Sequence, residues 1–153
     1  MKRTNLRLGV CICLLVLNLM FIWANSMLPA ELSAAFSRWV RNLLLGFSGT
    51  GGGGGTGIGL LRKVAHFSEF ACLGFLLGWL AGMLKKRKAA AWWLGFAAAC
   101  VDECIQFLAP GRAPRLTDVL IDTAGVLAGL GMLALVRYIR KTINYRESCR
   151  RSE

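Results

Sequence analysis

The only histidine of this chain stands in a short polar stretch, RKVAHFSE, next to a long apolar run. His66 is four positions after Arg62, and Glu69 is three positions after His66. This spacing places the three side chains on one face of a helix. Imidazole titrates near neutral pH, so His66 could act as a general acid or base, with a carboxylate to orient its ring. Arginine beside it suits phosphate or carboxylate groups. The stretch therefore predicts acid–base chemistry or anion binding.

Two further polar stretches repeat this helical spacing. In DECIQ, Asp102 and Gln106 are four residues apart, with Glu103 between them; in TDVLIDTAG, Asp118 and Asp122 are four residues apart. Each pair predicts one polar stripe along a helix. The elements that carry the stripes must bring them together, because acids need cationic or hydrogen-bonding partners when they leave water.

Composition indicates the solvent in which these helices fold. The chain is 56% hydrophobic and 18% charged, with a mean hydropathy of +0.52, whereas ordinary soluble domains are about 45–50% apolar. The sequence predicts a single all-α membrane domain over residues 1–153. Four apolar stretches could each cross a hydrocarbon core of about 30 Å, which takes about 20 helical residues. They are residues 8–24, 64–84, 89–108 and 116–136.

The basic residues predict the orientation of the four spans. The first span is expected to be a retained anchor, because no small-x-small cleavage pattern follows it. Placing the N-terminus in the cytoplasm puts most Lys and Arg residues there, including the run 85–88 and the tail 137–153, as the positive-inside rule requires. Both termini are therefore predicted to be cytoplasmic. The positive charge suits membrane lipids rather than nucleic acid, because it is dispersed among the spans.

The first outer loop is predicted to have two parts. Residues 30–46 place Leu32, Phe36, Trp39 and Leu43 at helical spacing, which is typical of an amphipathic helix lying in the membrane interface. The glycine-rich residues 49–59 predict a flexible linker. A phosphate-binding loop is rejected there, because no strand precedes the glycines and no Lys-Ser or Lys-Thr pair closes them.

The predicted spans bring all three polar stripes to the outer third of the membrane, counting about 1.5 Å per residue. Charge facing lipid is costly, so the stripes are expected to converge inside the bundle or on a pocket open to the outside. Glycines at small-xxx-small spacing, Gly74, Gly78 and Gly82 with Gly125 and Gly129, are interpreted as helix-packing residues. The residues predicted to form the binding site are Arg62, Lys63, His66, Glu69, Asp102, Glu103, Gln106, Arg112, Arg115, Asp118 and Asp122.

Two stretches, RKVAHFSEFACLGFLL (62–77) and DECIQFLAPGRAPRLTDVLIDTAGVLAG (102–129), resemble the VanZ-like family of small bacterial membrane proteins. The resemblance implies a multi-pass protein of the bacterial inner membrane. It covers the second to fourth spans. At residue 122 many members are expected to have Asn where this chain has Asp122, and the glycine run 51–55 is not expected of the family. The family pattern is matched by Arg62, Lys63, His66, Glu69, Asp102, Glu103, Gln106, Pro110, Gly111, Arg112, Asp118 and Gly125.

The resemblance implies a role in the cell envelope but no reaction. The name-giving member is associated with resistance to the glycopeptide teicoplanin, and most members have no assigned activity. The interpretation adopted from the sequence is a binding site for an anionic envelope lipid or a peptidoglycan precursor. A structural network of ion pairs that fixes the helix register is an alternative.

An enzyme acting on a lipid-linked envelope substrate is a further alternative. Its candidate catalytic residues are His66, Glu69, Asp102 and Glu103, with His66 as general acid or base. The sequence offers no clear nucleophile for such a reaction. A metal site of His66 with Glu69, Asp102 or Glu103 has suitable ligand types, but no second histidine supports it. No metal and no cofactor are therefore predicted, and the oligomeric state is left open.

Overall fold

The computed structural model describes residues 2–44, 56–111 and 115–151 of the chain. Within these ranges the regular structure is entirely helical, which confirms the all-α prediction. The five helices are α1 (Lys2–Met27), α2 (Ala30–Leu44), α3 (Thr56–Met83), α4 (Lys88–Leu108) and α5 (Leu116–Arg150).

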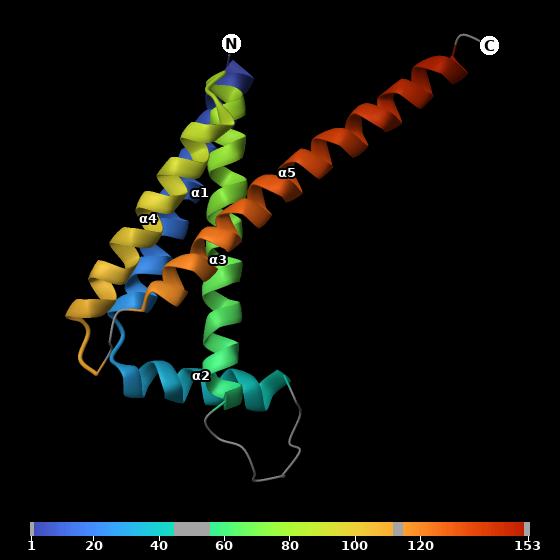
Figure 1. Cartoon of the computed structure of the whole chain (residues 1–153). Helices are drawn as coiled ribbons and strands as arrows, with labels where there is room; N and C mark the ends of the chain where they lie inside the picture. Colours follow the sequence, from blue (N-terminus) through green and yellow to red (C-terminus); the bar gives the residue numbers. More distant parts are fainter. Residues whose placement is uncertain (1, 45–55, 112–114, 152–153) are drawn as a thin grey trace.

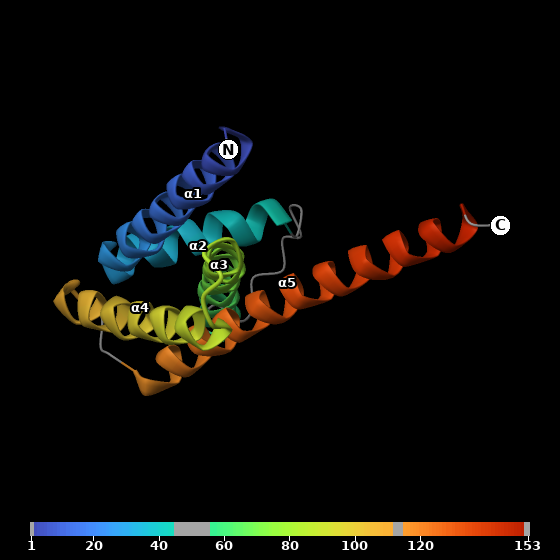
Figure 2. The ribbon, with the colours of Figure 1, turned by 90° about the horizontal axis from the view of Figure 1, so that it is seen from above.

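Helix α3 stands at the centre of the bundle. It contacts α1, α2, α4 and α5, whereas α1 and α4 also contact each other. In Figure 1, α5 crosses α3 obliquely, and both chain termini lie at the same end of the molecule. Figure 2 shows α1, α4 and α5 arranged around α3. Helices that run up and down in this way bring the start of α3, the end of α4 and the start of α5 to the end opposite the termini.

Among the residues that the structure describes, three helices are long and apolar enough to cross a membrane: Thr4–Met27, Gly59–Met83 and Leu116–Arg150. Helix α4 is not among them, although it coincides with the predicted span 89–108. Its 21 residues extend about 30 Å, at about 1.5 Å per residue. The acids Asp102 and Glu103 lower its mean hydropathy. The structure thus supports three of the four predicted spans by length and composition.

Glycines permit a close crossing of α3 and α5. A Cβ atom added at Gly74 would collide with the backbone of Val126, and one added at Gly129 would collide with the carbonyl oxygen of Ala71. Only residues without a side chain allow backbones to approach this closely. The interpretation of these glycines as packing residues is confirmed. The crossing also places the polar stripe of α3 opposite that of α5.

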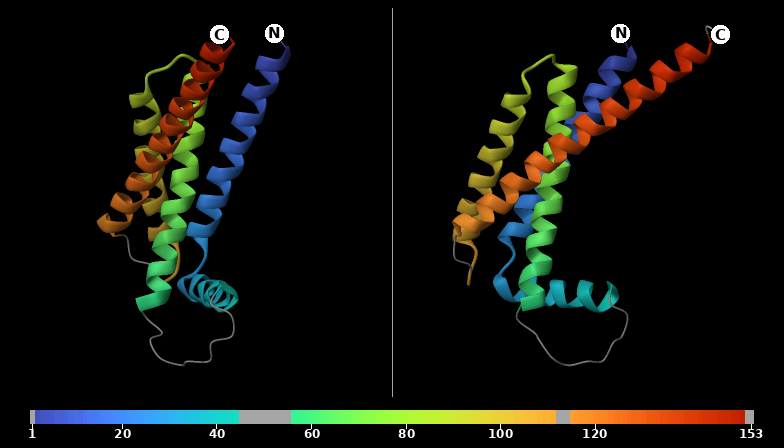
Figure 3. Two further views of the ribbon diagram at one scale, coloured as in Figure 1. Left: turned by 90° about the vertical axis from the view of Figure 1, so that its right-hand side faces the viewer. Right: turned by 45° about the vertical axis from the view of Figure 1, so that its right-hand side comes forward.

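Helix α2 turns its small polar residues toward the bundle. Ser33 and Ser37 are buried, whereas the apolar Leu32, Phe36 and Trp39 are more than half exposed. Figure 3 shows α2 lying across the N-terminal end of α3, on the side away from the chain termini. The helix agrees with the predicted range 30–46 as far as residue 44, and residues 45 and 46 lie outside the described part of the chain.

One predicted boundary differs from the structure, and the predicted basic tail is helical as far as Arg150. The linker was expected over residues 49–59, but α3 begins at Thr56, and residues 49–55 lie outside the described ranges. The tail from residue 137 belongs to α5, which continues to Arg150. No residue of α5 beyond Leu133 is buried, and Figure 1 shows this part of α5 standing away from the other helices. Its helical hydrogen bonds are local, so the helix can continue beyond the bundle.

Candidate functional site

A chain of hydrogen bonds joins α3 to α4 at the end of the bundle near α2. The Arg62 Nη2 atom donates to Oε1 of Gln106 at 3.0 Å, and Nε2 of Gln106 donates to Oδ2 of Asp102 at 2.7 Å. Gln106 and Asp102 lie four residues apart on α4, so the helix itself holds them in register. Both are almost completely buried, at 2% and 0% exposure. The network therefore fixes the direction of the arginine side chain.

His66, Asp102 and Asp122 form the buried centre of the site. One potential ligand atom from each lies within 4.8 Å of the other two. The Nδ1 atom of His66 is 3.9 Å from Oδ2 of Asp102, which is an ion-pair distance but too long for a hydrogen bond. The three residues come from α3, α4 and α5, and none is more than 7% exposed. Three separate helices thus place titratable side chains around one point.

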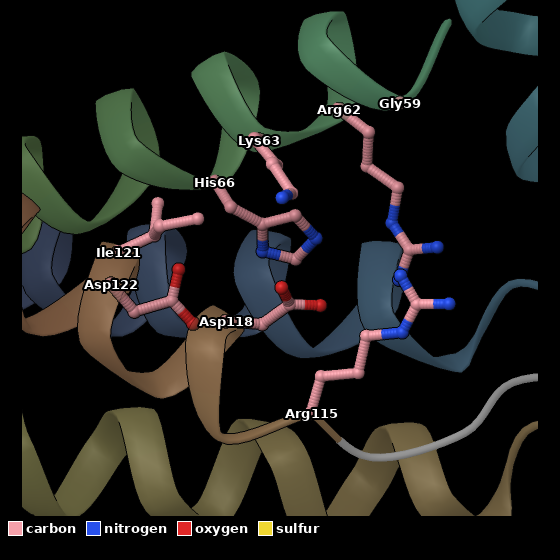
Figure 4. A pocket seen from close by; sticks show the side chains of 8 residues that line it. All are labelled: Gly59, Arg62, Lys63, His66, Arg115, Asp118, Ile121 and Asp122. Atoms are coloured by element: carbon pink, nitrogen blue, oxygen red, sulfur yellow. The ribbon is translucent and has the colours of Figure 1, made fainter. Parts of the chain in front are cut away.

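A pocket of about 100 Å³ opens between α3 and the start of α5. It is too small for a drug-sized ligand, which occupies about 300–1,000 Å³, but it has room for an ion or one charged group. Figure 4 shows the guanidinium groups of Arg62 and Arg115 directed toward the same region of the pocket, with His66 facing the acids of α5. The lining residues are Gly59, Arg62, Lys63, His66, Arg115, Asp118, Ile121 and Asp122.

Two like charges that point into one pocket repel each other unless an anion lies between them. Neither Arg62 nor Arg115 forms an ion pair with a carboxylate in the described part of the chain. Lys63 and Arg115 are exposed, whereas Arg62 is half-buried. The exposed mouth of the pocket is therefore cationic. Its buried floor carries the carboxylate of Asp122 and the imidazole of His66. Such a mouth suits phosphate or carboxylate groups.

Glu103 holds the start of α5 and does not line the pocket. Its Oε2 atom accepts a hydrogen bond from the backbone N–H of Arg115 at 3.1 Å. Arg115 is the residue that precedes α5, and the first N–H groups of a helix have no partner within the helix. The position predicted for catalysis or binding therefore has a structural role in placing Arg115 beside the pocket.

Glu69 faces α1 instead of the other acids. The Nδ2 atom of Asn25 donates to Oε1 of Glu69 at 2.9 Å, which ties the end of α1 to α3. Asn25 is a residue that sequence reasoning missed. The available signal was its position: a polar amide within the apolar run that ends the first helix, where an unpaired polar group would face lipid.

A second, larger cavity lies between α1, α2 and α3. Its volume is about 470 Å³, which is in the range of small-molecule binding sites. Most of its lining is apolar, and its polar side chains include Asn25, Arg62 and Glu69. The lining residues are Phe21, Ala24, Asn25, Leu28, Ser33, Phe36, Ser37, Val40, Leu61, Arg62, Ala65 and Glu69. We call this cavity the apolar groove.

The structure brings most of the predicted site residues together. Arg62, Lys63, His66, Arg115, Asp118 and Asp122 line the pocket, and Asp102 and Gln106 form the network behind it. Glu69 and Glu103 point elsewhere, as described above. Arg112 lies outside the described residues.

The fold and the site define an all-α protein with membrane-spanning helices around a buried cluster of polar side chains. The particular family follows from comparison of sequences. The sequence profile of the VanZ/LLP1 family matches residues 9–137, and the chain belongs to this family. Comparisons with curated proteins and with solved structures found no significant match.

Proposed function

We propose that this chain is a multi-pass protein of the bacterial inner membrane with four spans and both termini in the cytoplasm. The polar side chains that lower the hydropathy of α4, namely Asp102, Glu103 and Gln106, are buried inside the bundle. They therefore present no charge to lipid, and α4 spans the membrane with its neighbours. The basic residues cluster near the termini, and the pocket at the other end faces the outside.

In this orientation α2 lies in the outer membrane interface. Its buried serines face α3, and its exposed Leu32, Phe36 and Trp39 enter the lipid. Apolar side chains on such a helix bind the boundary between headgroups and acyl chains. The helix also forms one wall of the apolar groove, so a lipid in the outer leaflet has direct access to the groove.

The proposed function is binding of an anionic envelope lipid or a lipid-linked cell-wall precursor. The observation that carries it is that Arg62 lines both the cationic pocket and the apolar groove. A molecule with a phosphate group and a hydrocarbon chain has the same two parts. Its chain would occupy the groove, and its phosphate would lie between Arg62 and Arg115. The proposal includes an effect on teicoplanin susceptibility, which family membership supports.

Lipid binding can be measured by native mass spectrometry of the purified protein with phosphatidylglycerol, and with zwitterionic phosphatidylcholine as reference. We expect retention of phosphatidylglycerol to be the stronger. Arg62→Gln should weaken it by about tenfold to a hundredfold, because a charge-assisted hydrogen bond contributes about 1.5–3 kcal/mol. Ala65→Phe should also weaken it by filling the groove. Arg87→Gln, at an exposed position between α3 and α4, is the matched control and should leave binding unchanged. Equal retention of the two lipids by the wild type would refute the proposal.

The alternative is a membrane-embedded enzyme with His66 as general acid or base. The observation that favours it is the carboxylate of Asp102 beside the imidazole of His66. Their separation of 3.9 Å requires closer approach when a substrate is bound. Incubation with a lipid-linked diphosphate, followed by mass analysis, tests this function. Turnover by the wild type that is absent from His66→Gln would favour the enzyme over the binding protein.

A further inference from the structure

We propose that His66, Asp102 and Asp122 bind a divalent transition-metal ion, with Zn²⁺ as the first candidate. The inference goes beyond lipid binding and concerns a site at the floor of the pocket. It differs from the interpretation of the sequence, in which the lack of a second histidine counted against any metal. The third ligand is Asp122 of α5, which sequence spacing did not connect with the histidine.

The geometry brings the three ligands almost to coordination distance. Their nearest potential ligand atoms lie within 4.8 Å of one another. Zn²⁺ binds nitrogen and oxygen ligands at about 2.0–2.2 Å in tetrahedral geometry, so two ligand atoms of one ion lie about 3.3–3.6 Å apart. Side-chain rotations that move the ligand atoms by about 1 Å would close the remaining difference. Because the ligands come from three different helices, the ion would also join those helices.

The burial of Asp122 is an independent observation that favours a cation at this point. This residue is 1% exposed, and neither of its carboxylate oxygens has a hydrogen-bond partner among the described residues. The Oδ1 atom of Asp102, which is 0% exposed, likewise has no hydrogen-bond partner in the described part of the chain. Burial of a charged carboxylate without a partner is costly. A dication placed between the two carboxylates would remove that cost and neutralise both charges.

The lysine and arginine side chains nearby do not neutralise Asp102 and Asp122. Arg62 donates its hydrogen bond to Gln106, and within the described residues no Lys or Arg forms an ion pair with Asp102 or Asp122. In Figure 4 the guanidinium groups of Arg62 and Arg115 lie on the opposite side of His66 from Asp122. Within the described residues, therefore, no lysine or arginine balances the charge of the two buried acids.

The donor set selects the class of metal. One imidazole nitrogen and two carboxylates suit Zn²⁺, whereas Mg²⁺ and Ca²⁺ prefer oxygen ligands alone. Three protein ligands leave a coordination position open. Because His66 and Asp122 line the pocket, that open position would face the region where Arg62 and Arg115 converge. An anionic group in the pocket could reach the ion.

The test uses the full-length protein purified in detergent, stripped with chelator and then titrated with Zn²⁺ alone. Bound metal is measured by elemental mass spectrometry and calorimetry. We expect about one Zn²⁺ per chain, with affinity lowered about tenfold or more by Asp122→Asn or His66→Gln, since each removes a ligand. Glu147→Gln is the control, because it also removes one acidic charge from α5 but at an exposed position near the end of that helix, outside the pocket. It should bind Zn²⁺ like the wild type.

A second measurement does not depend on the folding of any variant. Zn²⁺ should raise the thermal unfolding midpoint of the stripped wild type, because a ligand that binds only the folded state stabilises it. Folded wild type that takes up no Zn²⁺ and shows no shift in midpoint would overturn the proposal. Uptake that Asp122→Asn leaves unchanged would overturn it as well, since the ion would then lie elsewhere.

Discussion

Arg62 of α3 and Gln106 of α4 are joined by a hydrogen bond of 3.0 Å between Nη2 and Oε1. This bond sets the direction of Arg62, whose side chain lines both the pocket and the apolar groove. The same glutamine donates to Asp102. A single side-chain amide therefore positions both the guanidinium of Arg62 and the carboxylate of Asp102. An amide can do this because it carries a donor and an acceptor.

Replacement of Gln106 by leucine should destabilise the bundle by about 1–3 kcal/mol, the cost of leaving a buried hydrogen-bonding group without its partner. Thermal unfolding in detergent, followed by tryptophan fluorescence, measures the loss. Ser68→Ala removes only an exposed hydroxyl that bonds to the carbonyl four residues before it, and it should change stability by less than about 0.5 kcal/mol. An equal effect of the two substitutions would contradict the assigned role of Gln106.

The close crossing of α3 and α5 predicts opposite outcomes at two glycines of α5. Gly129→Ala should lower the thermal midpoint strongly, because its new Cβ would collide with the Ala71 carbonyl, and overpacking costs about 1–3 kcal/mol. Gly131→Ala has no atom within 4 Å of the new Cβ and should be tolerated. If both variants unfold at the wild-type temperature, the helices do not approach as closely as described.

Cysteine labelling can test the proposed topology. Cys149 lies near the end of α5, and Pro110 lies in the connection between α4 and α5; both are exposed. In a background without the other cysteines, a membrane-impermeant maleimide should label Pro110→Cys on intact cells. It should label Cys149 only after permeabilisation. The reverse pattern would place the termini outside and the pocket in the cytoplasm.

Asp102→Asn should separate a functional site from a structural network. Expression of the wild type in a teicoplanin-sensitive bacterium is expected to raise resistance, and the variant should lose this effect at equal abundance in the membrane. The substitution keeps the shape of the side chain while removing its charge. Glu147→Gln, at an exposed position near the end of α5, is the control. Lower abundance of the Asp102 variant would instead indicate that the acid serves folding.

Much of the fold follows from the sequence alone. Apolar runs of about 20 residues specify helices in lipid, because every backbone polar group must be satisfied within the helix. The i, i+4 spacing of Asp102 and Gln106 places them on one face, and the structure confirms that they bond. The glycines of α3 and α5 likewise predicted a close approach of two helices, because such a crossing requires small residues.

The tertiary structure alone decided which partner each polar residue meets. Asp102 and Glu103 are adjacent in sequence, yet one lies beside His66 and the other holds the backbone of Arg115. Successive helical residues point about 100° apart, so the rotation of α4 against its neighbours determines these contacts. Glu69 similarly bonds to Asn25. Sequence spacing groups side chains within one helix, but only packing between helices sets how the groups face one another, and it was packing that placed Asp122 beside His66 and Asp102.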